Sequence, residues 1–241
     1  MEFFGLTDIG KVRKLNEDSI IFGKLGEKAA YLAVCDGMGG ANHGEVASMM
    51  AADRIKNNYS VTYRDEFSEA NIKNLINATL SLANADIFSK SASDFEFMGM
   101  GTTACTAIIK DSGEIVIGNI GDSRAYIIGD EVRQITEDHS LVWDLLKKGE
   151  ITKEDIGTHP DRNIITRALG AESRIEADIF YDNLKKGETL LICSDGLSGF
   201  VDESNILDSC REPIEVAARK LITLANDAGG KDNISVILCR I

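Results

Sequence analysis

The chain lacks the cysteine patterns that hold metals or cross-link small secreted proteins. Its five cysteines are an odd number, and no two of them are spaced as Cys-x-x-Cys. Three of the five end apolar runs, where cysteine behaves as a small buried hydrophobe. These features argue against a zinc cluster and a disulfide framework, and they favour a reducing cytoplasm.

Long apolar runs and an excess of basic residues are also missing. No stretch approaches the roughly 18–20 apolar residues of a membrane-spanning helix, and residues 1–8 do not read as the start of a signal peptide. Lys and Arg number 26 against 39 Asp and Glu, so the formal net charge is −13. This balance disfavours nucleic acid and anionic membranes as partners. We therefore expect a cytoplasmic protein without a membrane span.

Proline is scarce as well, with two residues in 241, and no linker-like stretch or internal repeat interrupts the chain. With 44% hydrophobic residues, a chain of this length can bury the core of one large sandwich-type domain, although two small domains would also fit. Because no boundary is visible, we expect a single domain over residues 1–241.

Apolar residues recur with strand-like and helix-like spacing along the chain. Strands are predicted at 19–22, 29–35, 102–109, 114–120, 125–128, 188–194 and 234–241, after a short first strand that begins at Phe3. Helices are predicted at 46–55, 72–87, 141–146 and 214–225. The helices fall between groups of strands, which disfavours a simple βαβ alternation. A short turn at 121–124 predicts that the two strands beside it pair as a hairpin.

Four aspartates stand beside these apolar strands. Asp36, Asp122 and Asp195 follow strands, and Asp232 stands just before the last one. A single aspartate next to glycine is more often an ordinary turn, but four such sites point to a shared role. Neighbouring antiparallel strands begin and end at the same edge, so all four carboxylates could lie together there.

Carboxylates gathered in this way would repel one another and raise one another's pKa unless cations lay between them. Oxygen ligands without His or Cys suit hard ions, which favours Mg²⁺ or Mn²⁺ over zinc. Two such ions roughly 3.5–4 Å apart can generate a hydroxide and bind a phosphoryl group. Arg13 offers the planar guanidinium that binds two phosphate oxygens, although it could also be one of several solvated cations on its loop.

Seven blocks of the sequence, taken in order, resemble the metal-dependent PPM/PP2C family of serine/threonine protein phosphatases. These blocks are 13–19, 36–40, 101–104, 121–126, 138–140, 194–197 and 230–233. The resemblance spans residues 5–241. The compact length and the methionine at Met38 are similar to the bacterial branch, whose members commonly oppose a membrane-bound Ser/Thr kinase.

The resemblance implies an α+β fold, a four-layer α-β-β-α sandwich in which two antiparallel sheets are flanked by helix pairs. It also implies a small flap insertion at about 141–165, in the polar and irregular part of the chain. The implied metals, Mn²⁺ or Mg²⁺, are two in the core site and a third, weaker one. Residues 1–241 are expected to act as a monomer on phosphorylated proteins, among them a Ser/Thr kinase.

The resemblance also implies roles for individual residues. Asp36 would bridge two metals, the carbonyl of Gly37 would bind one of them, and Asp195 and Asp232 would complete the shell of the first. Asp122, together with Asp195, would hold the third metal. Two further acidic residues, Glu17 and Asp18, would act through metal-bound waters, and Arg13 would hold the substrate phosphate.

The sequence departs from the family pattern at Met38, where many relatives carry a histidine assigned as the acid that protonates the leaving alkoxide. Other bacterial members place a histidine just after the glycine pair, where this chain has Ala41. His43 lies two residues further on and is a weak candidate for that acid. A metal-bound water is the preferred proton source.

Taken together, these features predict a phosphatase that hydrolyses phosphoserine and phosphothreonine in proteins with a metal-activated hydroxide, opposing a Ser/Thr kinase. The alternative is a non-catalytic relative that binds phosphoproteins. Such a relative would be expected to have lost one of the four aspartates, and all four are present.

Overall fold

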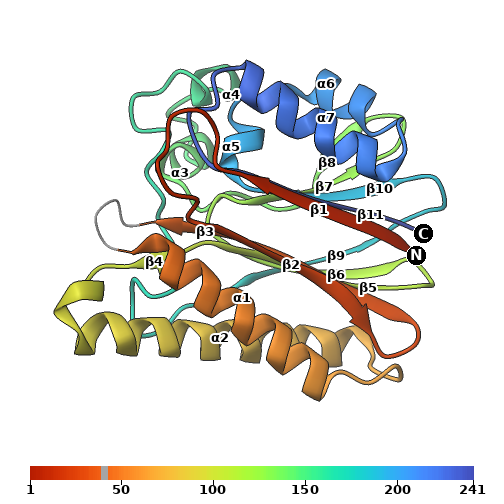
Figure 1. The fold of residues 1–241 in the computed structure, drawn as a ribbon, viewed down its shortest axis with the longest axis horizontal. Helices are drawn as coiled ribbons and strands as arrows, with labels where there is room; N and C mark the ends of the chain where they lie inside the picture. The colour runs from red at the N-terminus through yellow and green to blue at the C-terminus, as the bar shows by residue number, and fades with distance from the viewer. Residues whose placement is uncertain (39–42) are drawn as a thin grey trace.

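The structure, a computed structural model, describes residues 1–38 and 43–241. Two antiparallel sheets lie face to face in the middle of the molecule (Figure 1). The first sheet has the strand order β1 (Glu2–Asp8), β11 (Ile234–Arg240), β10 (Thr189–Cys193), β7 (Arg124–Ile128) and β8 (Val132–Gln134). The second has the order β2 (Asp18–Leu25), β3 (Ala29–Met38), β5 (Ala104–Lys110), β6 (Glu114–Ile120) and β9 (Asp178–Asn183), with the short β4 (Gly101–Thr102) paired to β3.

Helices cover the outer face of each sheet. The long helices α1 (Gly44–Thr62) and α2 (Glu69–Ser93) pack on the second sheet, and α6 (Glu203–Ser209) and α7 (Ile214–Asp227) lie over the first (Figure 1). The short segments α3 (Leu141–Lys147), α4 (Lys153–Ile156) and α5 (Asp195–Ser198) gather at one end of the sheets, and a single 3₁₀ turn, η1 (Phe95–Phe97), follows α2. The predicted α-β-β-α sandwich is confirmed.

Strand β3 shows why this sequence forms a layered fold. Its residues alternate between two apolar clusters: Tyr31, Ala33 and Cys35 face α1 and α2, whereas Leu32 and Val34 face the first sheet. Successive side chains of a strand point to opposite faces, so an unbroken apolar run suits a strand that is buried on both sides. The prediction for residues 29–35 is confirmed.

The predicted hairpin between β6 and β7 is wrong. Strand β6 pairs with β5 and β9 in the second sheet, whereas β7 pairs with β10 and β8 in the first. The turn between them therefore carries the chain from one sheet to the other. It begins at Gly121, whose φ of 104° lies in a region that favours glycine.

Other differences from the sequence prediction are smaller. The predicted strand 102–109 is interrupted at Thr103 and forms β4 and β5. The elements β8, β9 and α6 were not predicted, because they are short and carry few apolar residues in a regular pattern. Part of the predicted glycine-rich loop, Gly39 and Gly40, lies outside the described residues. Within the described part of the chain, no helix has the length and apolar content needed to cross a membrane.

The segment predicted as a flap, about 141–165, contains α3 and α4. It lies between β8 and β9 in the sequence and projects from the end of the sheets. A single antiparallel bridge between Ser140 and Ile165 closes its base. The Ser140 hydroxyl accepts a hydrogen bond from the backbone N–H of Trp143 and caps α3. Its role as a flap, like the single-domain organisation, remains a prediction.

Candidate functional site

The second sheet brings four of the predicted residues to one end. Asp18, at the start of β2, lies directly opposite Asp36, near the end of β3. The backbone N–H of Gly37 donates to the carbonyl of Glu17, with an N–O distance of 3.1 Å. The pairing of β2 with β3 thus fixes these residues relative to one another.

The first sheet supplies the other aspartates at the same end. Asp195 directly follows Ser194 at the end of β10, and Asp232 stands two residues before β11, the neighbour of β10. Asp122 stands two residues before β7, the other neighbour of β10, and Arg124 at the start of β7 lies opposite Cys193. Because β10 runs antiparallel to both neighbours, its end meets their beginnings.

A glycine allows two of these segments to approach closely. A Cβ atom added at Gly196 would lie 1.9 Å from the carbonyl oxygen of Asn233, well inside van der Waals contact. Glycine at this position therefore lets the turn that carries Asp195 pack against the segment that carries Asp232. The Asp-Gly pair here serves packing as well as turn formation.

Burial and mutual repulsion change the acidity of the cluster. Burial, followed by the charges of Asp122 and Asp232, raises the pKa of Asp195 to about 8. Burial and the charge of Asp18 raise the pKa of Asp36 well above its ordinary value. Carboxylates that repel in this way are stabilised by protons or by cations placed between them.

The pKa values of Asp18 and Asp122 are raised less than that of Asp195. Burial raises the pKa of Asp18 to about 6, although hydrogen bonds from Ser235 and Ser194 oppose the shift, and the Ser194 hydroxyl lies 2.8 Å from Oδ2 of Asp18. Burial and the nearby charge of Asp138 raise the pKa of Asp122 to about 6. The ionised forms of these two carboxylates, like those of Asp36 and Asp195, are therefore disfavoured.

The oxygen atoms of the cluster fit a hard cation. The Oδ1 atoms of Asp18, Asp122 and Asp195 are buried and accept no hydrogen bond from the described residues. Buried carboxylate oxygens normally have a donor or a metal as partner. Among residues 1–38 and 43–241, no three His, Cys, Asp or Glu side chains already stand as a ligand set for one ion, so a cation would have to draw these carboxylates together.

Thr102 and Thr103 fix the backbone beside Asp36. The Thr102 hydroxyl and the Thr103 N–H both donate to the carbonyl of Asp36, each at 2.9 Å, and the Asp36 N–H donates to Oγ1 of Thr103 at 2.9 Å. Thr103 also hydrogen-bonds the hydroxyl of Ser123, one residue after Asp122. These contacts connect the two sheets at the site and explain the break between β4 and β5.

Arg13 lies at the border of the carboxylate cluster. Its Nη2 atom is 2.8 Å from Oδ2 of Asp232, and its Nη1 atom is 3.9 Å from Oε2 of Glu17. Burial lowers the pKa of Arg13, but the hydrogen bond and charge of Asp232 outweigh this effect and raise it. The Arg13 side chain remains 45% exposed, so it can also reach a ligand from solvent.

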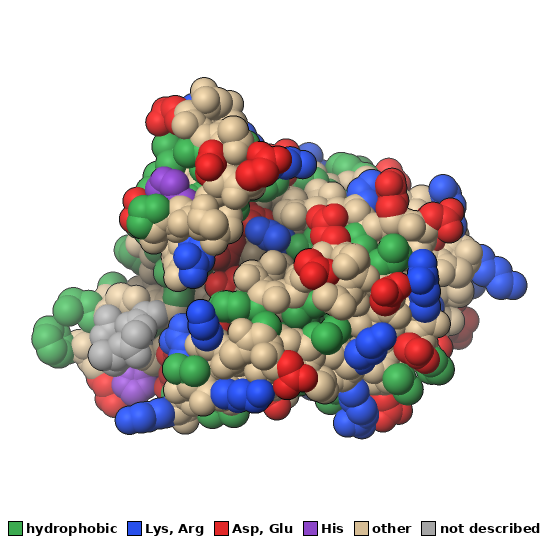
Figure 2. All heavy atoms as spheres, turned by 90° about the horizontal axis from the view of Figure 1, so that it is seen from above, with side chains coloured by type: hydrophobic (Ala, Val, Ile, Leu, Met, Phe, Trp, Pro, Cys, Tyr) green, Lys and Arg blue, Asp and Glu red, His purple; other side chains and the backbone are tan. Residues whose placement is uncertain are grey.

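A groove of about 540 Å³ opens from these residues toward the projecting segment. Its lining includes Asp122, Asp195 and Asp232, together with Trp143 of α3 and Phe200 after α5. Figure 2 shows acidic side chains at the bottom of a hollow that is bordered by basic side chains. The groove can therefore admit a polar ligand to the carboxylates.

An ion pair between the partly buried Arg124 and the buried Asp138 also lines this groove and was not predicted from the sequence. Arg124 forms two short contacts with Asp138, from Nε to Oδ1 at 2.9 Å and from Nη2 to Oδ2 at 2.6 Å. Asp138 is only 6% exposed, so its charge depends on Arg124 for compensation. Both residues lie within blocks that resemble the family, which was the only signal of their importance.

His43 is placed differently from the other candidates. Its Nδ1 atom lies 3.0 Å from Oε1 of Glu45, and its ring packs against Phe97 at a centroid distance of 5.1 Å. It is not one of the described residues that line the groove. The structure thus does not bring His43 together with the aspartate cluster.

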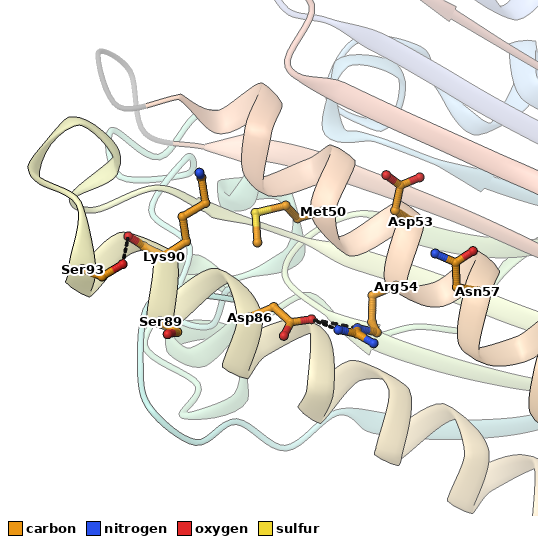
Figure 3. Close-up of a pocket in the computed structure, with 8 residues that line it drawn as sticks. All are labelled: Met50, Asp53, Arg54, Asn57, Asp86, Ser89, Lys90 and Ser93. Atoms are coloured by element: carbon orange, nitrogen blue, oxygen red, sulfur yellow. Dashed lines mark hydrogen bonds and ion pairs between the residues drawn. The ribbon is translucent and has the colours of Figure 1, made fainter.

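A second hollow, of about 530 Å³, lies between α1 and α2 (Figure 3). It contains the ion pair between Arg54 and Asp86, with Nη2 and Oδ2 2.5 Å apart, and Lys90 and Met50 lie further along it. Its described lining includes none of the predicted site residues. The groove at the carboxylate cluster is therefore the better candidate site.

Comparison with known proteins identifies the family. The family model described as protein phosphatase 2C matches residues 11–221. The serine/threonine phosphatase stp of Listeria innocua is 40% identical over 235 residues, which cover 96% of this chain and 92% of the relative. The chain belongs to the protein phosphatase 2C family, and the recognition from sequence is confirmed.

Solved structures agree with this assignment. The crystal structure of the serine/threonine phosphatase Stp1 from Staphylococcus aureus superposes with a TM-score of 0.94 at 35% identity, covering all of this chain and 94% of that one. The catalytic domain of the phosphatase PstP in complex with two manganese ions superposes with a TM-score of 0.84 at 31% identity, covering 98% of this chain and 96% of that one. The family is metal-dependent, in agreement with the predicted need for divalent cations.

Proposed function

We propose that this chain is an active serine/threonine protein phosphatase that uses divalent cations to hydrolyse phosphoserine and phosphothreonine in proteins. The observation that carries the proposal is the cluster of Asp18, Asp36, Asp122, Asp195 and Asp232 beside Arg13. Three of these aspartates, Asp122, Asp195 and Asp232, line an open groove. Family membership and the names of the relatives support the phosphatase class. The non-catalytic alternative is not favoured, because all four predicted aspartate ligands are retained.

Within this proposal, Asp36 would bridge two ions, with the Gly37 carbonyl, Asp195 and Asp232 completing their shells. Asp122 would hold a third, weaker ion together with Asp195. Bound in this way, Mn²⁺ or Mg²⁺ would activate water for attack on phosphorus and offset the charge of the phosphoryl group.

Arg13 would bind the phosphate of the substrate and orient it for in-line attack, because its guanidinium borders the cluster and can bond two oxygens. Glu17 and Asp18 would accept hydrogen bonds from ordered water, and Ser194 would hold the Asp18 carboxylate in place through its 2.8 Å hydrogen bond. Met38 has no proton to donate to the leaving oxygen. Water in the groove would supply that proton.

The substrates would be phosphorylated proteins, among them a Ser/Thr kinase, encountered by a cytoplasmic monomer. The groove supports this class because its volume of about 540 Å³ can hold more than a phosphate group. The net charge of −13 supports the exclusion of nucleic acid as a partner.

The test is hydrolysis of an aryl phosphate and of a phosphothreonine peptide by the purified chain, with Mn²⁺, with Mg²⁺ and with EDTA. We expect turnover of both substrates with a divalent cation and none with EDTA. Absence of metal-dependent turnover in protein that is folded by circular dichroism would overturn the proposal in favour of the non-catalytic alternative.

A further inference from the structure

Asn233 binds the loop that carries Arg13, although the two lie more than 200 positions apart in the sequence. Its Nδ2 group donates to the carbonyl oxygens of Ile9 and Leu15, each at 3.0 Å. Its Oδ1 atom accepts a hydrogen bond from the backbone N–H of Glu17 at 2.9 Å. One side chain thus contacts the loop where it begins and where it ends.

These three hydrogen bonds require an asparagine. The primary amide supplies two N–H donors to two carbonyls and one oxygen to an N–H, and an aspartate at this position would have no donor for either carbonyl. Asn233 is only 4% exposed, so water offers little replacement for a lost bond.

Apolar packing contributes little to holding the tip of the loop. Val12 is 64% exposed and Leu15 is 53% exposed, so apolar packing does not fix the tip of the loop. Among the described residues, the other contacts of the tip are polar. The N–H groups of Lys11 and Val12 donate to the carbonyl of Gly230 at 2.7 and 3.1 Å. Arg13 pairs with Asp232 at 2.8 Å, and the exposed Lys11 pairs with Asp227 at 3.5 Å. The segment 230–233 therefore anchors the tip.

The same segment carries Asp232. The backbone N–H of Asn233 donates to Oδ1 of Asp232 at 2.9 Å, while Oδ2 of Asp232 faces Arg13. Asn233 thus orients a carboxylate with its backbone and holds the arginine loop with its side chain.

We propose that Asn233 is a positioning residue that holds the loop so that Arg13 lies beside the carboxylates expected to bind metal. The segment 230–233 would then position both the phosphate-binding Arg13 and the metal-binding Asp232. This inference rests on the proposed function of Arg13 as phosphate ligand. Loss of the side-chain contacts would release the loop that carries Arg13 and weaken substrate binding. The carboxylates would stay in place, because the pairing of the strands in or beside which they lie does not depend on the Asn233 side chain. The effect would therefore fall on KM more than on kcat.

The test compares Asn233→Ala with a matched control, Asn84→Ala. Asn84 is also buried and also binds two backbone groups, the carbonyl of Glu172 and the N–H of Gly170, at 2.9 and 2.8 Å. We expect Asn233→Ala to raise KM for an aryl phosphate about tenfold at saturating Mn²⁺, with kcat within about threefold of the unmodified protein. We expect Asn84→Ala to leave KM unchanged.

A double variant tests whether Asn233 acts through Arg13. If it does, Arg13→Ala combined with Asn233→Ala should have a KM within about twofold of Arg13→Ala alone, because the second change has nothing left to misplace. If the rise in KM of the double variant were the product of the rises in the two single variants, the proposal would be overturned. An unchanged KM in Asn233→Ala, or an equal rise in Asn84→Ala, would also overturn it.

Limited trypsin digestion without added metal gives a readout that does not depend on activity. Lys11, Arg13 and Lys14 are trypsin sites in the loop, and we expect cleavage there to be at least about fivefold faster in Asn233→Ala than in Asn84→Ala. Equal rates in the two variants would contradict the anchoring role. If Asn233→Ala does not fold, Asn233→Ser keeps a small polar side chain that is too short to bond all three backbone groups, and it carries the same expectations.

This design separates the inference from the proposed function. If the unmodified protein shows no metal-dependent turnover, the proposed function fails, and the trypsin comparison still decides whether Asn233 holds the loop. If the unmodified protein is active and Asn233→Ala behaves as the control does, the inference about Asn233 alone fails.

Discussion

The guanidinium of Arg13 pairs with the carboxylate of Asp232, with Nη2 and Oδ2 2.8 Å apart. Arg13, which is expected to bind phosphate, and Asp232, which is expected to bind a metal, are thus in direct contact. A divalent ion that recruits Asp232 would compete with this pair and leave the guanidinium available to a phosphate.

Arg13→Ala should raise KM about tenfold while kcat changes by less than about threefold, because the guanidinium binds phosphate in the ground state and in the transition state alike. Steady-state kinetics with an aryl phosphate measure both constants. Lys14→Ala, a neighbouring change on the same loop, is the control and should leave KM unchanged. A large fall in kcat at constant KM would contradict this role.

Asp232→Asn should abolish turnover and weaken metal binding by more than about 100-fold, since even residues behind a metal ligand can cost 10–100-fold. Titration calorimetry with Mn²⁺ measures the affinity directly. Asp227→Asn is a suitable control, because Asp227 is exposed and contacts only Lys11 at 3.5 Å among the described ion pairs. Unchanged metal affinity in Asp232→Asn would refute its role as a ligand.

His43→Ala should leave kcat within about threefold of the unmodified protein, because the structure directs its imidazole to Glu45 and Phe97 and not to the aspartate cluster. The measurement is kcat for a substrate with a poor leaving group, whose departure depends most on protonation. A loss of about 100-fold would make His43 the general acid.

Metal-free protein should lose stability as the pH rises from about 7 to about 9. The folded-state pKa of Asp195 is about 8, above its ordinary value of 3.8, so its contribution to stability is full below the ordinary value and is lost as the pH rises through about 8. Asp36 is shifted in the same direction. Burial lowers the pKa of His139, so its effect is a rise in stability with pH. That rise occurs below its ordinary pKa of 6.5 and therefore does not offset the fall expected between about pH 7 and about pH 9.

Thermal unfolding in EDTA at several pH values tests this expectation. Saturating Mn²⁺ should remove most of the fall in Tm, because a cation replaces the protons that the cluster otherwise binds. A Tm that rises over the same range in EDTA would contradict the assignment of raised pKa values to the cluster.

Arg124→Leu should destabilise the fold by about 3 kcal/mol, because it leaves the Asp138 carboxylate buried without its cation. Arg133→Leu removes an ion pair to Asp182 whose arginine is 50% exposed, and it should cost less than about 1 kcal/mol. Urea unfolding of both variants gives the comparison. Equal effects would show that burial of the first pair has no energetic consequence.

The amino-acid sequence by itself determined the elements with strong local patterns. The apolar run 29–35 predicted a strand buried on both faces, and the helical spacing at 72–87 and 214–225 predicted α2 and α7. The recurrence of aspartates beside strands indicated a metal site, and the ordered motifs indicated the family. These signals are local, because each depends on the spacing of residues within one segment.

Only the tertiary structure decided how these segments combine. The residues of the turn that begins at Gly121 are compatible both with a hairpin of β6 and β7 and with a crossing between the two sheets. The crossing is decided by the pairing of β6 with β9 and of β7 with β10. The hydrogen bonds of Asn233 to Ile9 and Leu15 likewise join residues that no local pattern relates. Such contacts form only when distant segments pack together, since the free energy that selects them comes from shared burial and from satisfying polar groups that packing removes from water.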